Sequence, residues 1–210
     1  YTAIREDIER DDSRRIVDIN VAGTANLLDL ARSLSVQRFL YVSSGGVYEG
    51  LEGLDAPLAE DTPVLPRRLY NATKYASELL TRRYGELHGY EAVSVRLGSP
   101  YGPMERVTGH RAVMSMTHQW TGMAVRGEPI DVAPGGPWDF TYVLDIAAGI
   151  RTVIDAPELP HDVYNLAKGV PIMTDDMVAA IREAHPSVTI NENPDSSAPV
   201  LSSSTSGRVA

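Results

Sequence analysis

The sequence predicts an α/β protein built on a doubly wound parallel sheet, with a smaller α+β lobe in its second half. Three observations predict this fold. In the first 100 residues, amphipathic helical segments alternate with compact apolar runs typical of parallel sheets. After residue 100 the segments become shorter and more irregular. The 210 residues are 43% apolar, which is enough for one sizeable core and a small satellite.

The first half predicts helix, strand, loop, helix and strand in that order. Residues 13–34 carry apolar side chains at three- and four-residue spacing, which predicts a helix with Ser13 as its N-cap. Residues 36–44 form a compact apolar run and predict a buried strand. A stretch rich in Gly and Pro leads to a helix from about Tyr70, and another buried strand is expected over 91–98.

The second half predicts a polar loop over 101–111 and then short elements. Helices are expected near 111–125, over 144–157 and over 174–185, the last with a Thr/Asp cap. Strands are expected at 128–133, 139–143 and 162–167.

Composition excludes several classes of function. The net charge of −9 argues against a nucleic-acid surface and against binding to an anionic membrane. The absence of cysteine excludes disulfides and thiolate-bound metal, and it favours a reducing compartment such as the cytoplasm. No apolar run approaches the roughly 18 residues that span a bilayer. Histidines do not cluster at ligand spacing, so we predict no metal site.

A tyrosine and a lysine lie four residues apart at the start of the helix expected near residue 70. Tyr70 and Lys74 are just over one turn apart, so their side chains project from one face. An ammonium about 4 Å from a phenolate gives roughly 4 kcal/mol at an effective dielectric of about 20. That energy lowers a phenol's pKa by up to about three units, toward neutrality. The pair is a candidate proton-transfer site; the alternative is an interfacial tyrosine beside a solvated lysine.

Ser44 lies at the carboxyl end of the strand expected over 36–44. Open α/β sheets form their ligand crevice at this end of the strands. A serine hydroxyl there can hydrogen-bond the oxygen whose proton Tyr70 handles. The alternative is that Ser43 and Ser44 only close the strand into a turn.

Six segments resemble the extended short-chain dehydrogenase/reductase family in their order and spacing. They are NVAGTANLLDLA, RFLYVSSGGVYEG, YNATK, VRLGSPYGP, DFTYVLDIA and VYNLAKG. This family of NAD-dependent epimerases and dehydratases includes UDP-galactose 4-epimerase, and the resemblance covers residues from about 12 to 170. It specifies the family strongly and the substrate weakly.

The resemblance implies a Rossmann-like fold and a role for each matching residue. Ser44, Tyr70 and Lys74 fall on the family's catalytic triad: Tyr70 is the acid/base, Lys74 also binds the nicotinamide ribose, and Ser44 orients the reacting oxygen. The implied cofactor is NAD, with NADP left open. The matching cofactor-binding residues are Asn20, Ser43, Ser44, Tyr70, Lys74, Gly98, Ser99 and Pro100.

The Gly-rich turn and the second-strand acid that hold a dinucleotide in this family are absent from the sequence. The family places them upstream, so we expect this chain to be the later part of a longer protein. We then expect residues 1–100 to be the C-terminal part of a Rossmann domain and 101–190 to be mainly a substrate lobe, with some segments returning to the Rossmann domain. Residues 191–210 are expected to be a poorly ordered tail.

The expected substrate site departs from the nucleotide-sugar pattern. Gly45 and Gly46 replace the Asp-Glu pair of sugar 4,6-dehydratases, which disfavours elimination of water. Ser99 stands where nucleotide-sugar enzymes typically have Asn, and Trp138 where they often have a diphosphate-binding Arg.

Two arginines in the polar loop, Arg106 and Arg111, could instead hold a carboxylate or phosphate on a small substrate. A solvated loop is the alternative interpretation of both. Together with Gly45, Ser99 and Trp138, these arginines are the candidate substrate-binding residues.

The leading hypothesis is an NAD(P)-dependent oxidoreductase or epimerase acting on a secondary alcohol of a sugar-like substrate. A nucleotide-sugar 4-epimerase acting on a UDP-sugar is the alternative, and a non-catalytic cofactor-sensing protein is a third interpretation. The resemblance also implies a homodimer through the helices that start near Ser13 and Tyr70, with Leu79, Leu80 and Tyr84 as contact residues.

Overall fold

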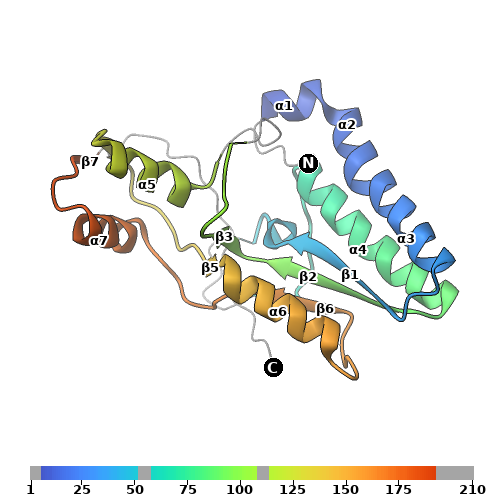
Figure 1. Ribbon diagram of the computed structural model, residues 1–210. Helices are drawn as coiled ribbons and strands as arrows, with labels where there is room; N and C mark the ends of the chain where they lie inside the picture. The colour runs from blue at the N-terminus through green and yellow to red at the C-terminus, as the bar shows by residue number, and fades with distance from the viewer. Residues whose placement is uncertain (1–5, 52–57, 108–113, 193–210) are drawn as a thin grey trace.

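A three-stranded parallel sheet with strand order β1-β2-β6 lies at the centre of the larger part of the molecule (Figure 1). The structure is a computed structural model and describes residues 6–51, 58–107 and 114–192. The strands are β1 (Arg38–Ser44), β2 (Glu91–Leu97) and β6 (Val163–Leu166). The prediction of a parallel α/β fold is confirmed, and the run 162–167 joins this sheet rather than the smaller lobe.

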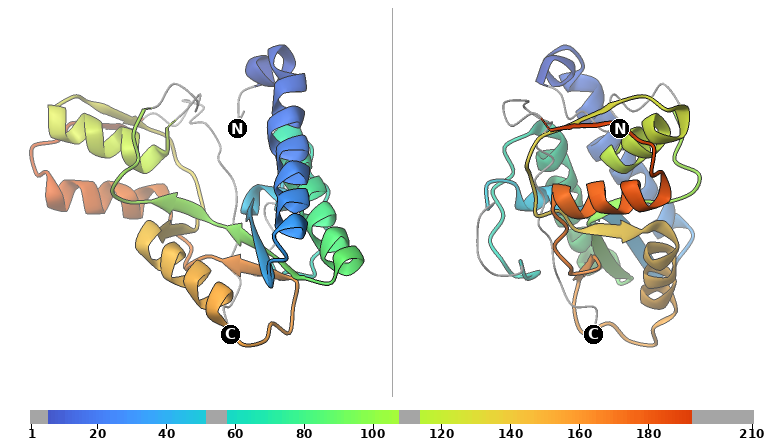
Figure 2. Two further views of the ribbon diagram at one scale, coloured as in Figure 1. Left: turned by 45° about the vertical axis from the view of Figure 1, so that its right-hand side comes forward. Right: turned by 90° about the vertical axis from the view of Figure 1, so that its left-hand side faces the viewer.

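Helices cover both faces of the sheet, as the two further views show (Figure 2). α4 (Leu69–His88) packs on one face, with α3 (Gly23–Ser33) beside it, and α6 (Val143–Asp155) packs on the other. Successive side chains of a strand point to opposite faces. Val93 and Val95 therefore pack with Val153 of α6, whereas Arg96 reaches Glu78 of α4.

The segment expected as one helix over 13–34 is interrupted by a π turn. α1 (Glu6–Asp11) and α2 (Ser13–Val17) precede the π turn Asp18–Ala22, which runs directly into α3. The N-cap prediction for Ser13 is wrong, because Ser13 is the first helical residue and Asp12 occupies the cap position without a side-chain cap bond. The apolar spacing continues through the interruption, so the sequence pattern did not reveal it.

α4 begins one residue before Tyr70, as the sequence predicts. It runs for 20 residues and ends at Gly89, whose φ of 75° is the left-handed conformation that glycine adopts without strain. Its buried residues are polar or small, and the helix packs against β1 and β2, so it holds Tyr70 and Lys74 beside the end of β1.

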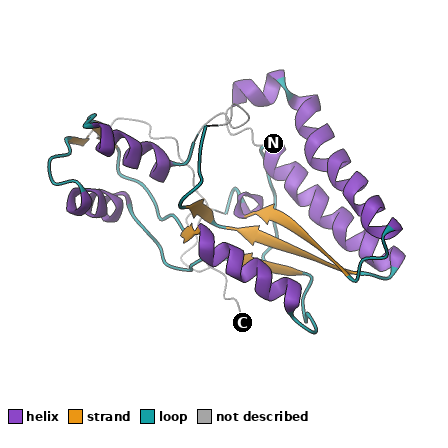
Figure 3. Ribbon diagram, in the orientation of Figure 1, coloured by secondary structure: helices purple, strands orange, loops and turns teal. Residues whose placement is uncertain are grey.

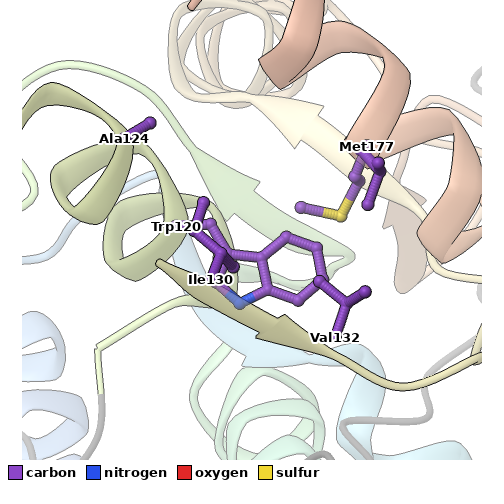
Figure 4. Close-up of a cluster of buried hydrophobic side chains, with 6 residues drawn as sticks. Trp120, Ala124, Ile130, Val132 and Met177 are labelled. Atoms are coloured by element: carbon purple, nitrogen blue, oxygen red, sulfur yellow. The ribbon is translucent and has the colours of Figure 1, made fainter. Parts of the chain in front are cut away.

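The smaller lobe comprises α5 (Met116–Arg126), β4 (Ile130–Val132), α7 (Thr174–Ala184) and β7 (Ile190–Glu192). Figure 3 shows these elements set apart from the main sheet. β4 and β7 pair in parallel, and β3 (Ser99–Tyr101) pairs with β5 (Phe140–Tyr142) between the two parts. The lobe has its own core around Trp120, where Ile130, Val132 and Met177 meet (Figure 4).

Several local expectations differ from the structure. The helix expected near 111–125 starts at Met116, because the hydroxyl of Ser115 caps it by accepting from His118 N at 3.1 Å. The cap of α7 is formed by Asp176, which accepts from Met173 N at 2.8 Å. β3 and β7, of three residues each, were not predicted. Residues 193–210, most of the expected tail, lie outside the described residues.

Candidate functional site

The three parallel strands end at one edge of the sheet, where the predicted site residues gather. In the strand register Ser44 pairs with Leu97, and Leu97 pairs with Leu166. Ser44, Gly98 and the residues after Leu166 therefore lie at the same carboxyl edge. A ligand crevice in an open α/β sheet forms at this edge.

Lys74 lies against the end of β1 and faces two tyrosine rings. Its Nζ donates to Val42 O at 2.8 Å. The same nitrogen is 4.9 Å from the ring centroid of Tyr41 and 6.0 Å from that of Tyr70. Burial lowers the pKa of Lys74, and the negative charge of Glu78 opposes that shift. The structure thus places the lysine one turn from Tyr70 and beside the strand that carries Ser44.

Ser44 ends β1 in an extended conformation and leads into the 3₁₀ turn Gly45–Tyr48. Its Oγ accepts from Gly46 N at 3.1 Å, which leaves its single proton available to a substrate oxygen. A Cβ on Gly46 would lie 2.3 Å from Oδ1 of Asn71, so the turn packs closely against the first turn of α4. This close approach brings Ser44 to the end of α4 where Tyr70 lies.

Asn20, predicted as a cofactor residue, is buried in the π turn and bonded to α4. Its amide donates to Thr73 Oγ1 at 3.0 Å, and Thr73 in turn donates to Tyr70 O at 2.7 Å. Its carbonyl accepts from Thr24 Oγ1 at 2.6 Å and from Ser77 Oγ at 2.9 Å. The π turn therefore supports the first two turns of α4, which include Tyr70 and Lys74.

Ser43, also predicted as a cofactor residue, is buried on the α4 face of the sheet. It donates to Glu78 Oε1 at 2.5 Å. Glu78 pairs with Arg96 of β2 at 2.7 Å, and both side chains are only 4% exposed. Burial alone would lower the pKa of Arg96, but the bonds and charge of Glu78, with those of Tyr48, raise it. Arg96 therefore remains charged inside the protein.

Sequence reasoning missed this buried network, which continues beyond Arg96. Arg96 donates to Tyr48 Oη at 2.7 Å, and Tyr48 donates to Asn165 Oδ1 at 3.0 Å. Asn165 lies on β6 and is fully buried. The network ties α4 to all three strands of the sheet. An arginine inside the apolar run 91–98 was the available signal, because a buried charge needs a partner.

Sequence reasoning also missed Asp139, which holds the ends of β2 and β6 together. Its carboxylate accepts from Gly169 N at 2.8 Å and from Lys168 N at 3.0 Å, and its carbonyl accepts from Ser99 N at 2.8 Å. A Cβ on Gly98 would lie 3.1 Å from that carbonyl. Gly98 is therefore packed closely beside Asp139, and the following Pro100 is exposed.

The structure disperses the predicted substrate residues. Gly45 is buried in the turn after Ser44, and Ser99 is half-buried at the start of β3. Arg106 is exposed, whereas Arg111 lies outside the described residues. Trp138 is only 5% exposed and its backbone pairs with Ile172 in an antiparallel bridge.

Two further features concern ligands. A cavity of about 620 Å³ opens on the α4 face, lined by residues that include Tyr75 and Arg82 but none of Ser44, Tyr70 and Lys74. Among the described residues, no cluster of three or more histidine or carboxylate side chains could hold a metal ion.

No helix in the described part of the chain is long and apolar enough to cross a membrane.

A family model, the NAD dependent epimerase/dehydratase family, matches residues 5–167 of the chain. The chain belongs to this family. UDP-glucuronate 4-epimerase of Thermodesulfobacterium geofontis is 33% identical over 156 residues, which are 73% of this chain and 45% of that protein. The chain spans about half the length of the curated relatives it matches.

Two solved structures show the same fold at 25% identity or slightly more. UDP-glucose 4-epimerase of Thermus thermophilus in complex with NAD is 26% identical, with a TM-score of 0.69 over 88% of this chain and 61% of that one. The GalE-like L-threonine dehydrogenase of Cupriavidus necator, in its holo form, is 25% identical, with a TM-score of 0.75 over 92% of this chain and 63% of that one.

The residues at the carboxyl edge fit the nicotinamide half of NAD, the cofactor of this family. The Lys74 ammonium has three N–H donors, of which one bonds Val42 O, and such donors suit ribose hydroxyls. Gly98, Ser99 and Pro100 leave the sheet at the same edge without a large side chain. The donor chemistry of Lys74 and the small residues after β2 therefore agree with the family assignment.

Proposed function

We propose that the full-length protein catalyses hydride exchange between NAD and a secondary alcohol of a sugar-like substrate, with Tyr70 as the acid/base. The observation that carries the proposal is the placement of Lys74. Its ammonium is 2.8 Å from the Val42 carbonyl and 6.0 Å from the centroid of the Tyr70 ring, at the strand end that carries Ser44. Family membership supports the same interpretation.

Each of the three residues has one task in this proposal. Ser44 donates its hydroxyl proton to the reacting oxygen of the substrate, because its own Oγ already accepts from Gly46 N. Tyr70 removes or returns the proton of that oxygen through its phenolic oxygen. The positive charge of Lys74 stabilises the phenolate form of the tyrosine.

NAD, when bound, supplies the hydride acceptor and donor. Lys74 would bind its ribose, and Gly98, Ser99 and Pro100 would line the nicotinamide ring. Asn20 and Ser43 would support these residues indirectly, since their hydrogen bonds run to side chains of α4.

The substrate class has two candidates. The UDP-glucuronate 4-epimerase among the relatives favours a nucleotide sugar, for which the reaction is epimerisation. The L-threonine dehydrogenase among the solved structures, together with Ser99 and the buried Trp138, favours a small hydroxy compound without a diphosphate. Arg106 and Arg111 would then hold its carboxylate or phosphate.

Titration of the full-length protein with UDP and with simple sugar acids, in the presence of NAD, separates these candidates. Absorbance at 340 nm reports whether the same compounds reduce NAD. Micromolar binding of UDP with no response to sugar acids would select the nucleotide-sugar epimerase. Binding of a sugar acid that weakens roughly ten- to a hundredfold in Arg106→Ala supports the small-anion substrate. A protein that binds NAD but turns over neither class of substrate would contradict the proposal.

We also propose the domain division and location that the sequence suggests. Residues 1–100, joined by α6 and β6, would form the dinucleotide-binding part, and the remainder of 101–190 the substrate lobe. The separate core around Trp120 supports this division. A chain without cysteine suits the cytoplasm.

Association as a homodimer through α3 and α4 is our proposal for quaternary structure. Leu27 and Leu30 of α3 are 56% and 51% exposed, and Leu79 of α4 is 41% exposed. Leu80 and Tyr84, the other predicted contact residues, are half-buried. Exposed leucines on two adjacent helices suit an interface between copies of the chain.

Light scattering of the full-length protein at micromolar concentration is expected to give the mass of a dimer. The double variant Leu30→Arg/Leu79→Arg is expected to shift that mass toward the monomer, because it places charge in the apolar contact. Val125→Arg is the matched control, since Val125 is 67% exposed on α5 of the other lobe and should leave the dimer intact. A wild-type protein that remains monomeric would exclude this association.

A further inference from the structure

A second tyrosine lies closer to the Lys74 ammonium than Tyr70 does. Tyr41 is on β1, three residues before Ser44, and its side chain is buried. Its ring centroid is 4.9 Å from Lys74 Nζ, against 6.0 Å for the Tyr70 ring. The Val42 carbonyl at 2.8 Å and the two rings are thus all neighbours of the ammonium.

The hydroxyl of Tyr41 is held by side chains that are themselves fixed. It interacts with the hydroxyls of Ser77 and Thr24. Each of those hydroxyls has a single proton, and each donates it to Asn20 O. Burial raises the pKa of Tyr41 to about 12, although its interactions with Ser77 and Thr24 lower that pKa, so Tyr41 stays protonated.

The titratable groups that face Lys74 lie on β1 and α4. β1 contributes Tyr41, and α4 contributes Tyr70 and Glu78. Glu78 is committed to Arg96 of β2 by a 2.7 Å ion pair. The π turn presents the neutral Asn20 to α4. The face of the Tyr41 ring is thus a neutral surface that attracts the ammonium without adding a counter-charge.

We propose that Tyr41 is a positioning residue that confines the Lys74 ammonium between its ring and the Val42 carbonyl, so that the charge faces Tyr70. The inference rests on the proposed roles of Tyr70 and Lys74. Tyr41 has no proton-transfer task in it, because only its ring acts on the cation.

Exchanging the ring and the hydroxyl separately tests this role in the full-length protein. Tyr41→Phe keeps the ring, and Tyr41→Leu keeps an apolar side chain without it. In Tyr41→Leu the site stays buried while the attraction to the cation is lost, so the pKa of Lys74 is expected to fall. We expect kcat to drop about two- to thirtyfold and the acidic limb of the pH–rate profile to move to higher pH. Tyr41→Phe should stay near wild type in kcat and in the pH–rate profile.

The pKa of Lys74 can be measured without any substrate. Nuclear magnetic resonance of protein labelled with ¹³C-lysine gives its titration, and the Lys74 signal is identified by its absence from Lys74→Met. Tyr41→Met carries the same expectation if Tyr41→Leu does not fold. Equal Lys74 titrations in Tyr41→Leu and Tyr41→Phe would overturn the proposal, whatever the activities. A lowered Lys74 pKa in Tyr41→Leu alone supports it, even in a protein that turns over no substrate, which would count only against the proposed function.

Discussion

Replacing Tyr70 by phenylalanine in the full-length protein is expected to lower kcat by about 10²- to 10⁴-fold while NAD binding stays nearly unchanged. The ring that faces Lys74 is retained, and only the oxygen that exchanges the proton is lost. Steady-state kinetics with the identified substrate and titration with NAD measure the two quantities separately.

Tyr75→Phe is the matched control for this substitution. Tyr75 lies on the same helix and lines the cavity on the α4 face rather than the edge that carries Ser44. It should keep wild-type turnover. If Tyr70→Phe also kept wild-type turnover, the assignment of Tyr70 as the acid/base would be wrong.

Glu78→Gln is expected to destabilise the protein by about 3–5 kcal/mol, the usual cost of breaking a buried ion pair by removing one partner. Arg96 is only 4% exposed and its charge would remain without a counter-charge. Ser43 would lose the charged carboxylate to which it donates. Denaturant unfolding of the full-length protein should show a lower midpoint at an unchanged slope.

Two further variants test whether the burial of the ion pair is the cause of the lost stability. The double variant Glu78→Leu/Arg96→Met removes both charges and should recover much of the lost stability. Glu128→Gln breaks an ion pair of the same 2.7 Å length, with Arg126, at the surface. Solvent screens that pair, so the unfolding midpoint should hardly change. Equal losses in Glu78→Gln and Glu128→Gln would contradict this account.

Local sequence patterns were enough to predict two of the three strands of the main sheet and the helix of the candidate site. α4 begins at Leu69, next to Tyr70, because helical spacing starts where the Pro-rich segment ends. The two long strands were predicted correctly because each contains a compact run of apolar residues. The Tyr70–Lys74 pair then followed from helical geometry alone, and the structure places the pair at the end of β1.

The sequence did not predict features that depend on contacts between distant segments. The π turn is held by Asn20 bonding Thr73, 53 residues away, and local spacing contains no sign of that bond. Tyr41 looks like one more apolar residue in a buried run, and only the fold brings Lys74 over its ring. Glu78 lies one turn beyond Lys74 on α4, but its ion-pair partner, Arg96, is on strand β2.

Among the residues that the structure describes, the core around Trp120 shares none with the core around Val95. The side chains proposed to move the proton all belong to β1 and α4, whereas the lobe that would shape the substrate is packed around its own interior. Mutations accepted in the lobe core can therefore change which molecule docks without altering the charge and burial of Lys74. A protein organised in this way can acquire new specificities over evolution while one reaction is inherited unchanged.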